Sequence, residues 1–100
     1  MIIARKNAYK EDVVVVEPGP NLISDQCAIY SITIASEADG DAIVSFSNSL
    51  EYDSDLRVEK VALTAENHTI QLVYPGGKLL TTGLTAISNV ASVDVSVTYE

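Results

Sequence analysis

A strict alternation of apolar and polar residues near the end of the chain constrains its fold more than any other feature. In the run SVDVSVTY every second residue is apolar, and these residues are Val93, Val95, Val97 and Tyr99. Successive side chains of a β-strand point to opposite faces of its sheet. The period of two therefore predicts a strand with one face on a core and the other face in water.

Shorter runs of the same kind fill much of the remaining sequence. The runs expected to form strands include 26–36, 42–47, 57–64, 68–74, 85–88 and 93–99. Turn residues separate them about every ten positions, a spacing typical of antiparallel sandwiches and small barrels. We therefore predict an all-β fold, a single small antiparallel β-sandwich or jelly-roll-like barrel of seven to eight short strands with an extended N-terminal arm.

The first two of these runs are predicted to form a hairpin, because Gly40 lies between them and can take the positive φ of a turn. Three alternating residues of the first run are expected to share one face: Tyr30, Ile32 and Ile34. The polar segment 48–56 that follows the hairpin is expected to be a loop.

Two later runs depart from simple alternation. In 57–64 the phase slips near Glu59 and Lys60, which predicts a β-bulge, with a short amphipathic helix as the alternative. Pro-Gly-Gly at 75–77 is a strong breaker, so the strand 68–74 is expected to end there. The segment after it is expected to be irregular, with Gly83 at a bulge or bend.

Composition limits the classes of protein to which the chain can belong. One hundred residues, 47% of them apolar, are enough for one domain with one core. No window is long and apolar enough for a membrane span, and the start lacks the apolar segment of a signal peptide. Cys27 is the only cysteine and His68 the only histidine, so we expect neither a disulfide nor a structural zinc site.

Charge divides the chain into two parts. Residues 1–10 hold three basic residues and no acid, whereas residues 11–100 hold fourteen acids and three bases, so the charges are +3 and −11. Pro18-Gly19-Pro20 then marks a boundary, which predicts an N-terminal arm over 1–20 and a β-sandwich domain over 21–100. An acidic domain would repel nucleic acid.

The arm is the predicted partner-binding segment. Its basic residues could dock on an acidic partner, or could simply be part of a solvated surface. Its four consecutive valines need burial, either in the core, at a sheet edge or against another subunit. The candidate binding residues are Arg5, Lys6, Lys10, Val13, Val14, Val15 and Val16.

Residues with catalytic or metal-binding chemistry form no convincing site. Cys27 and His68 lack the third orienting group that a nucleophile and its base require. The acids of 39–41 and 51–55 could supply oxygens to Ca²⁺, but their spacing does not fit the twelve-residue calcium loop. Asn67-His68-Thr69 matches a glycosylation acceptor, which has no role without secretion. We expect no catalytic residue, no cofactor and no metal.

Tyrosines are the remaining candidates for a ligand site. Exposed tyrosine rings could form a sugar-binding platform, although alternation with aliphatic residues favours packing for three of them. The five tyrosines are Tyr9, Tyr30, Tyr52, Tyr74 and Tyr99.

The C-terminal part of the chain resembles a known group of proteins. An apolar strand enters a Pro/Gly turn at 73–77, a Thr-Gly-Leu bend follows at 82–84, and a V-x-V-x-Y strand closes the chain at 95–99. With a strand, Asp-Gly turn and strand at 32–44, this pattern is similar to small accessory proteins encoded among the structural genes of tailed bacteriophages. The resemblance covers about residues 27–99.

The resemblance implies a structural role in a virion and no enzymatic activity. Such a protein would decorate the capsid surface, be made in the host cytoplasm, bind the major capsid protein and form a small homo-oligomer, without nucleic-acid or membrane partners. The alternative role is a module of a tail or fibre that binds a glycan or a receptor.

Overall fold

The computed structural model describes residues 2–7, 21–36, 41–90 and 93–100. These residues form eight strands and one short 3₁₀ turn, η1, at Ser54–Leu56. The strands are β1 (Ile2–Asn7), β2 (Asn21–Ile23), β3 (Cys27–Ser36), β4 (Ala42–Ser47), β5 (Arg57–Leu63), β6 (Thr69–Leu80), β7 (Leu84–Ser88) and β8 (Val93–Tyr99).

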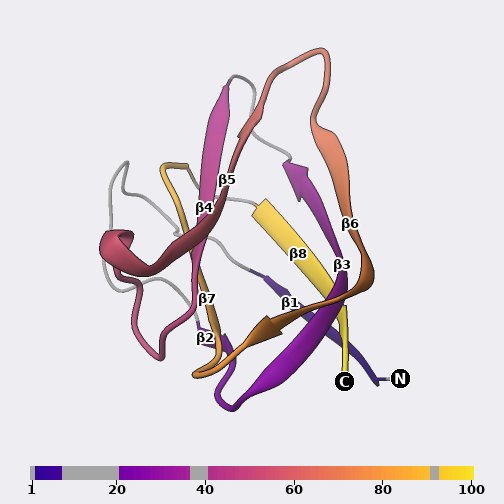
Figure 1. Ribbon diagram of the computed structural model, residues 1–100. Coiled ribbons are helices and arrows are strands. Elements are labelled where there is room, and N and C mark those ends of the chain that lie inside the picture. The colour runs from indigo at the N-terminus through magenta and orange to yellow at the C-terminus, as the bar shows by residue number, and fades with distance from the viewer. Residues whose placement is uncertain (1, 8–20, 37–40, 91–92) are drawn as a thin grey trace.

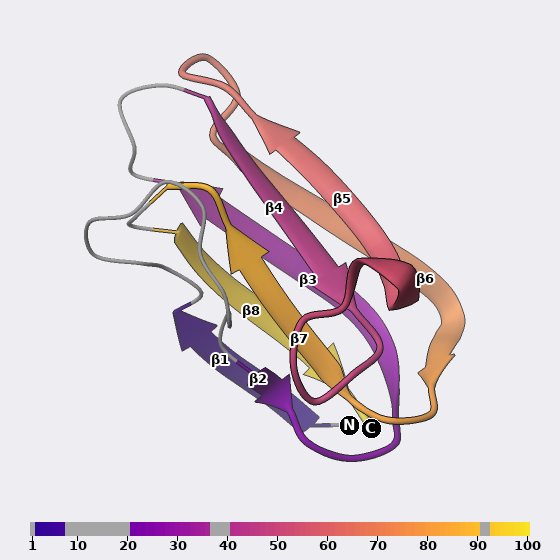
Figure 2. The ribbon, with the colours of Figure 1, turned by 90° about the vertical axis from the view of Figure 1, so that its left-hand side faces the viewer.

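The strands form two antiparallel sheets of four, packed as the layers of a sandwich (Figures 1 and 2). The first sheet has the order β1-β8-β3-β6 and the second the order β2-β7-β4-β5. The sheets do not close into a barrel. The predicted all-β sandwich is therefore confirmed.

The strand order follows from one nested pairing. The first strand pairs with the eighth, the second with the seventh, the third with the sixth and the fourth with the fifth. Two further ladders, β3 with β8 and β4 with β7, fold this long antiparallel ribbon into two sheets. Eight strands in this order are the double-sheet jelly roll.

The core lies between the sheets and contains the apolar residues of the alternating runs. The largest fully buried side chains are Phe46, Ile29, Ile32, Ile34, Leu63, Leu80 and Leu84. In β8 the alternation is confirmed, because Val93, Val95 and Val97 are buried while Asp94 is exposed. Cys27 is a buried, free thiol in the same cluster.

The β3–β6 ladder is irregular on both strands, and each irregularity differs from what the sequence predicts. The register shifts between Ile29 and Ser31, so both Ile29 and Ile32 are buried and Tyr30 does not share the buried face of Ile32. Opposite this point, β6 continues through 75–77 to Leu80 instead of ending at Tyr74. A proline is tolerated there because β6 is an edge strand.

The second sheet differs from expectation in detail. Residues 57–63 form a strand and not a helix, and their bulge lies at Val58, because Phe46 pairs with Glu59 and Ser47 with Arg57. Strand β2 was not expected, since three residues are too few to show a period. Strand β7 begins one residue earlier than predicted.

The N-terminal segment also differs from the predicted arm. Residues 2–7 pair with β8 and form an edge of the first sheet, so this part of the expected arm belongs to the body. The run IIARKN shows no alternation, and for this reason its strand was missed. Residues 8–20, with Lys10 and the four valines, lie outside the described residues.

Gly83, in the connection from β6 to β7, has the least room among the glycines that the structure describes. A Cβ atom there would lie 2.4 Å from the Ile23 carbonyl oxygen, and its φ is +157°. Gly76 is a useful contrast, because its φ is +80° and a Cβ atom would meet nothing within 4 Å.

We predict that Gly83→Ala lowers the free energy of unfolding by about 3 kcal/mol, because the backbone of β2 must move away. Gly76→Ala should cost only about 1 kcal/mol of backbone strain. Urea denaturation of both variants measures the difference. Equal losses would show that the close approach of Gly83 to Ile23 is not important.

Candidate functional site

On β3, β6 and β8, the outer face of the first sheet, which points away from the second sheet, carries a single charged strand residue. Ladder partners on β3, β6 and β8 share this face, as the pairs Ala28–Leu79, Ser31–Val73 and Thr33–Gln71 illustrate. Its residues on these three strands are Ala28, Tyr30, Ser31, Thr33, Ala35, Thr69, Gln71, Val73, Leu79, Asp94, Ser96 and Thr98. Asp94 alone among them is charged, in a chain of net charge −8.

Two aliphatic side chains of β6 stand out on this face. Val73 is 61% exposed and Leu79 is 63% exposed, the highest values among the large apolar side chains described. The irregular segment 75–77 separates them along the strand. A Cβ atom added to Gly77 would lie 3.1 Å from the Tyr30 ring, so the ring packs directly over this glycine. Apolar groups therefore cluster around the bulge.

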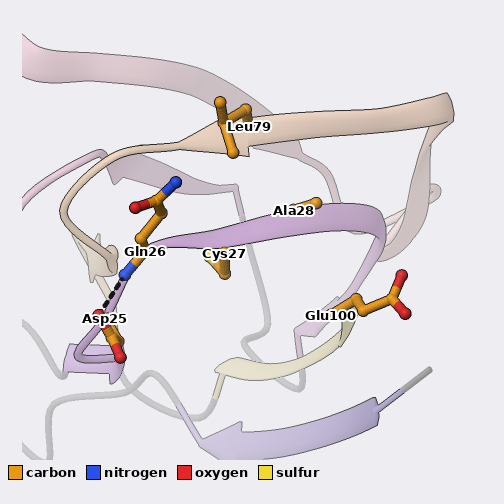
Figure 3. Close-up of a pocket in the computed structure, with 6 residues that line it drawn as sticks. All are labelled: Asp25, Gln26, Cys27, Ala28, Leu79 and Glu100. Atoms are coloured by element: carbon orange, nitrogen blue, oxygen red, sulfur yellow. Dashed lines mark hydrogen bonds between the residues drawn. The ribbon is translucent and has the colours of Figure 1, made fainter.

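A shallow pocket of about 400 Å³ lies at the end of this cluster (Figure 3). Its lining residues are Asp25, Gln26, Cys27, Ala28, Leu79 and Glu100, and we call it the β3–β6 pocket. Gln26 and Leu79 lie on the same side of β3 in Figure 3, whereas Cys27 points to the other side, toward the core. The lining contains two carboxylates and no lysine or arginine.

Both carboxylates of the pocket have a defined position. The Tyr30 hydroxyl donates a hydrogen bond of 2.9 Å to Oε2 of Glu100, and this bond raises the pKa of the Tyr30 phenol. The backbone of Glu100 exchanges two hydrogen bonds with Ala28. At the other end of the pocket, the backbone N–H of Gln26 donates to Oδ1 of Asp25 at 2.8 Å.

Part of the outer face of the second sheet is covered instead. The segment 48–53 lies across β7 (Figure 2), and Oγ1 of Thr85 donates a hydrogen bond of 2.8 Å to the Ser49 carbonyl. Asn48 accepts from the backbone N–H groups of Thr82 and Gly83. Asp53 accepts from the backbone N–H of Asp55 and so caps η1. The polar groups of this loop, which is confirmed as the connection after β4, are therefore largely used in internal hydrogen bonds.

The structure separates Cys27 from His68. The backbone N–H of Ser36, at the far end of β3, donates to the His68 carbonyl at 2.8 Å. The length of β3 from Cys27 to Ser36, nine residue steps or about 30 Å, therefore separates the two residues. Burial, and then the charge of Asp25, raises the pKa of the Cys27 thiol. These two residues do not form a nucleophile and base pair.

The predicted binding residues are only partly described. Arg5 and Lys6 lie in β1, opposite Ser96 and Val95 of β8 in register. Lys10 and Val13, Val14, Val15 and Val16 lie outside the described residues, as do Tyr9 and Asp39. Tyr74 and Tyr99 pack against the core, as expected for packing tyrosines. Sequence reasoning missed the outer-face cluster, because the bulge that places Tyr30 beside Gly77 has no clear sequence signal.

Comparison with known proteins adds no family. No protein-family model matches the chain, and no curated protein matches it. Within the described residues, no His, Cys, Asp and Glu side chains gather in a group that could hold a metal ion. The same residues contain no helix long and apolar enough to cross a membrane.

Tyr74 joins the edges of the two sheets beside this site. Its hydroxyl is buried and makes no hydrogen bond of normal geometry to a described residue, although Glu59 lies near it, and the Lys78 ammonium lies 5.5 Å from its ring centroid. Burial, together with the nearby negative charge of Glu59 on β5, raises the pKa of Tyr74 to about 12. The folded state thus favours the neutral phenol.

We predict a loss of stability at high pH that depends on Tyr74. In the unfolded chain a phenol titrates near pH 10, whereas the pKa of Tyr74 in the folded state is about 12. The contribution of Tyr74 to the free energy of unfolding is therefore constant below about pH 10 and is lost between about pH 10 and 12. Tyr74→Phe should flatten the fall in unfolding free energy between pH 9 and 11.5, measured by urea denaturation, whereas Tyr52→Phe should not. A fall that is unchanged in Tyr74→Phe would contradict the prediction.

Proposed function

We propose that the chain is a non-enzymatic virion structural protein, a capsid decoration protein that stabilises a phage head shell by bridging neighbouring capsid subunits. It would be made in the host cytoplasm, be located on the capsid surface and act as a small homo-oligomer. Its partner in this proposal is the major capsid protein.

The observation that supports this proposal most is the outer face of the first sheet. Two aliphatic side chains more than 60% exposed lie on this face beside the Tyr30 ring, and the residues around them on β3 and β6 are uncharged, so they form an exposed apolar cluster. A face of this kind suits contact with another protein. The sequence resemblance to phage accessory proteins and the jelly-roll order, which recurs in viral capsid domains, agree with it.

Bridging requires a second contact, which the free edge of β1 could provide. This strand is at the edge of the first sheet, and a partner strand could add to it through main-chain hydrogen bonds. Arg5 and Lys6 lie on it, and Lys10 and the valines 13–16 follow in the sequence. Weak contacts of this kind gain strength when they repeat over a lattice.

The first test is the copy number in particles. Virions are purified from a phage whose genome encodes this chain. Quantitative mass spectrometry should find the chain at a copy number comparable to that of the major shell protein. Its absence from virions would overturn the proposal.

The second test maps the contact. We predict that the double variant Val73→Ser with Leu79→Ser no longer binds phage heads from which the native protein has been removed. The reason is that the variant lacks both exposed aliphatic groups of the outer face. Leu50→Ser with Leu56→Ser is the matched control, since those leucines are 53% and 48% exposed but lie in the loop after β4. Circular dichroism should show both variants folded. Equal binding by the two variants would place the contact elsewhere.

A second candidate function is glycan or receptor binding from a tail or fibre. It is favoured by the polar lining of the β3–β6 pocket, where Asp25, Gln26 and Glu100 could accept or donate hydrogen bonds to hydroxyl groups. Jelly rolls also occur among lectin domains. This function predicts a low copy number in virions and a glycan affinity that Glu100→Gln abolishes.

A further inference from the structure

We infer that the β3–β6 pocket and the adjacent aliphatic cluster form a docking site for a protein segment that carries arginine next to apolar side chains. This inference rests on the proposed function, because it names the chemistry that the capsid partner would present. The occupant is thus a foreign basic segment and not a second copy of the chain.

The charge around the pocket determines the first part of this chemistry. Asp25 and Glu100 line the pocket, and no basic side chain lines it. Lys78 precedes Leu79 in sequence, but its ammonium lies over the Tyr74 ring. In ladder register Lys78 faces Ile29, on the opposite face of β6 from Leu79. Among the side chains that the structure describes, no cation complements these carboxylates, and we therefore expect it from a partner.

The apolar groups determine the second part. Leu79 belongs both to the pocket lining and to the outer face, so one side chain connects the carboxylates with the exposed Val73. A segment lying along β6 would place an apolar side chain on Leu79 and Val73 while its cation reaches Glu100. Arginine suits this better than lysine, because its planar guanidinium can bind a carboxylate in a bidentate manner and can stack on a ring such as that of Tyr30.

Hydrogen bonds hold the Glu100 carboxylate in position before a partner's cation binds to it. The Tyr30 hydroxyl holds one oxygen, Oε2, and the backbone pairing with Ala28 fixes the position of the residue at the end of β3. A carboxylate held in this way loses less side-chain entropy on binding than a free one.

A second copy of the chain fits this site less well. Each copy has a formal charge of −8, so association of two copies brings like charges together.

The test uses the full-length protein labelled with ¹⁵N and a short capped peptide of alternating valine, arginine and leucine. We expect amide shift changes at Ala28, Leu79 and Glu100 on titration, with weakening as NaCl rises from 50 to 500 mM. The same peptide with citrulline in place of arginine keeps the shape but not the charge, and should bind at least about threefold more weakly. Equal binding by the citrulline peptide, or shift changes confined to other residues, would overturn the inference.

Matched variants separate the pocket from general charge effects. Glu100→Gln keeps an acceptor for Tyr30 and should weaken binding of the arginine peptide by about three- to fivefold, the range of an exposed ion pair. Glu66→Gln removes the same charge from an exposed loop position and should change the affinity less than twofold. Equal effects of the two substitutions would show a non-specific attraction and overturn the site.

Failure of this inference and failure of the proposed function have different signatures. If virions contain many copies of the protein but the arginine and citrulline peptides bind equally well, the decoration role stands and the proposed arginine docking site is wrong. Charge-selective binding of the peptide, with no protein in virions, would do the opposite.

Discussion

The two ladders β3–β8 and β4–β7 are the interactions on which the rest of the structure depends. The other four strand pairings need only a long antiparallel ribbon, which alone would leave both faces of every strand in water. The two additional ladders bend that ribbon on itself, so that the apolar faces of both sheets meet. Ile32 and Ile34 of β3, paired with Val97 and Val95 of β8, lie at the centre of this contact.

The irregularity in β3 links this core to the candidate site. With regular alternation from Ile32 and Ile34, Tyr30 would enter the core and Ile29 would be exposed. The register shift reverses both positions, burying Ile29 and leaving Tyr30 at the surface, where it contacts Gly77 and Glu100. Glycines at 76 and 77, with φ values of +80° and +88°, let β6 follow the same distortion. The bulge therefore creates the outer-face cluster without removing apolar area from the core.

The sequence predicted the regular part of the fold well, because period-two alternation is a local property. The bounds of β4 and β8 and the buried positions of β8 agree with expectation. Predictions failed where tertiary contacts outweigh local signals. A proline such as Pro75 would end a central strand but is tolerated in an edge strand. The sequence does not show which strands lie at an edge, so the continuation of β6 could not be predicted. Strand β1 depends on an open edge of β8, a partner almost ninety residues away. The candidate site depends on these same non-local features and could not be predicted from the sequence.

The two outer faces of the sandwich differ, and this difference bears on function more than the fold does. The loop after β4 covers part of the second sheet and uses its own polar groups to do so, burying Ser47 and Thr85. No described segment lies over the cluster around Val73 and Leu79 in the first sheet, and their side chains remain in water. A chain of net charge −8 with an exposed aliphatic cluster on one face can attach through that cluster. The acidic remainder then disfavours non-specific aggregation in solution. One-sided attachment of this kind is what a protein needs to cover a surface without aggregating before it reaches that surface.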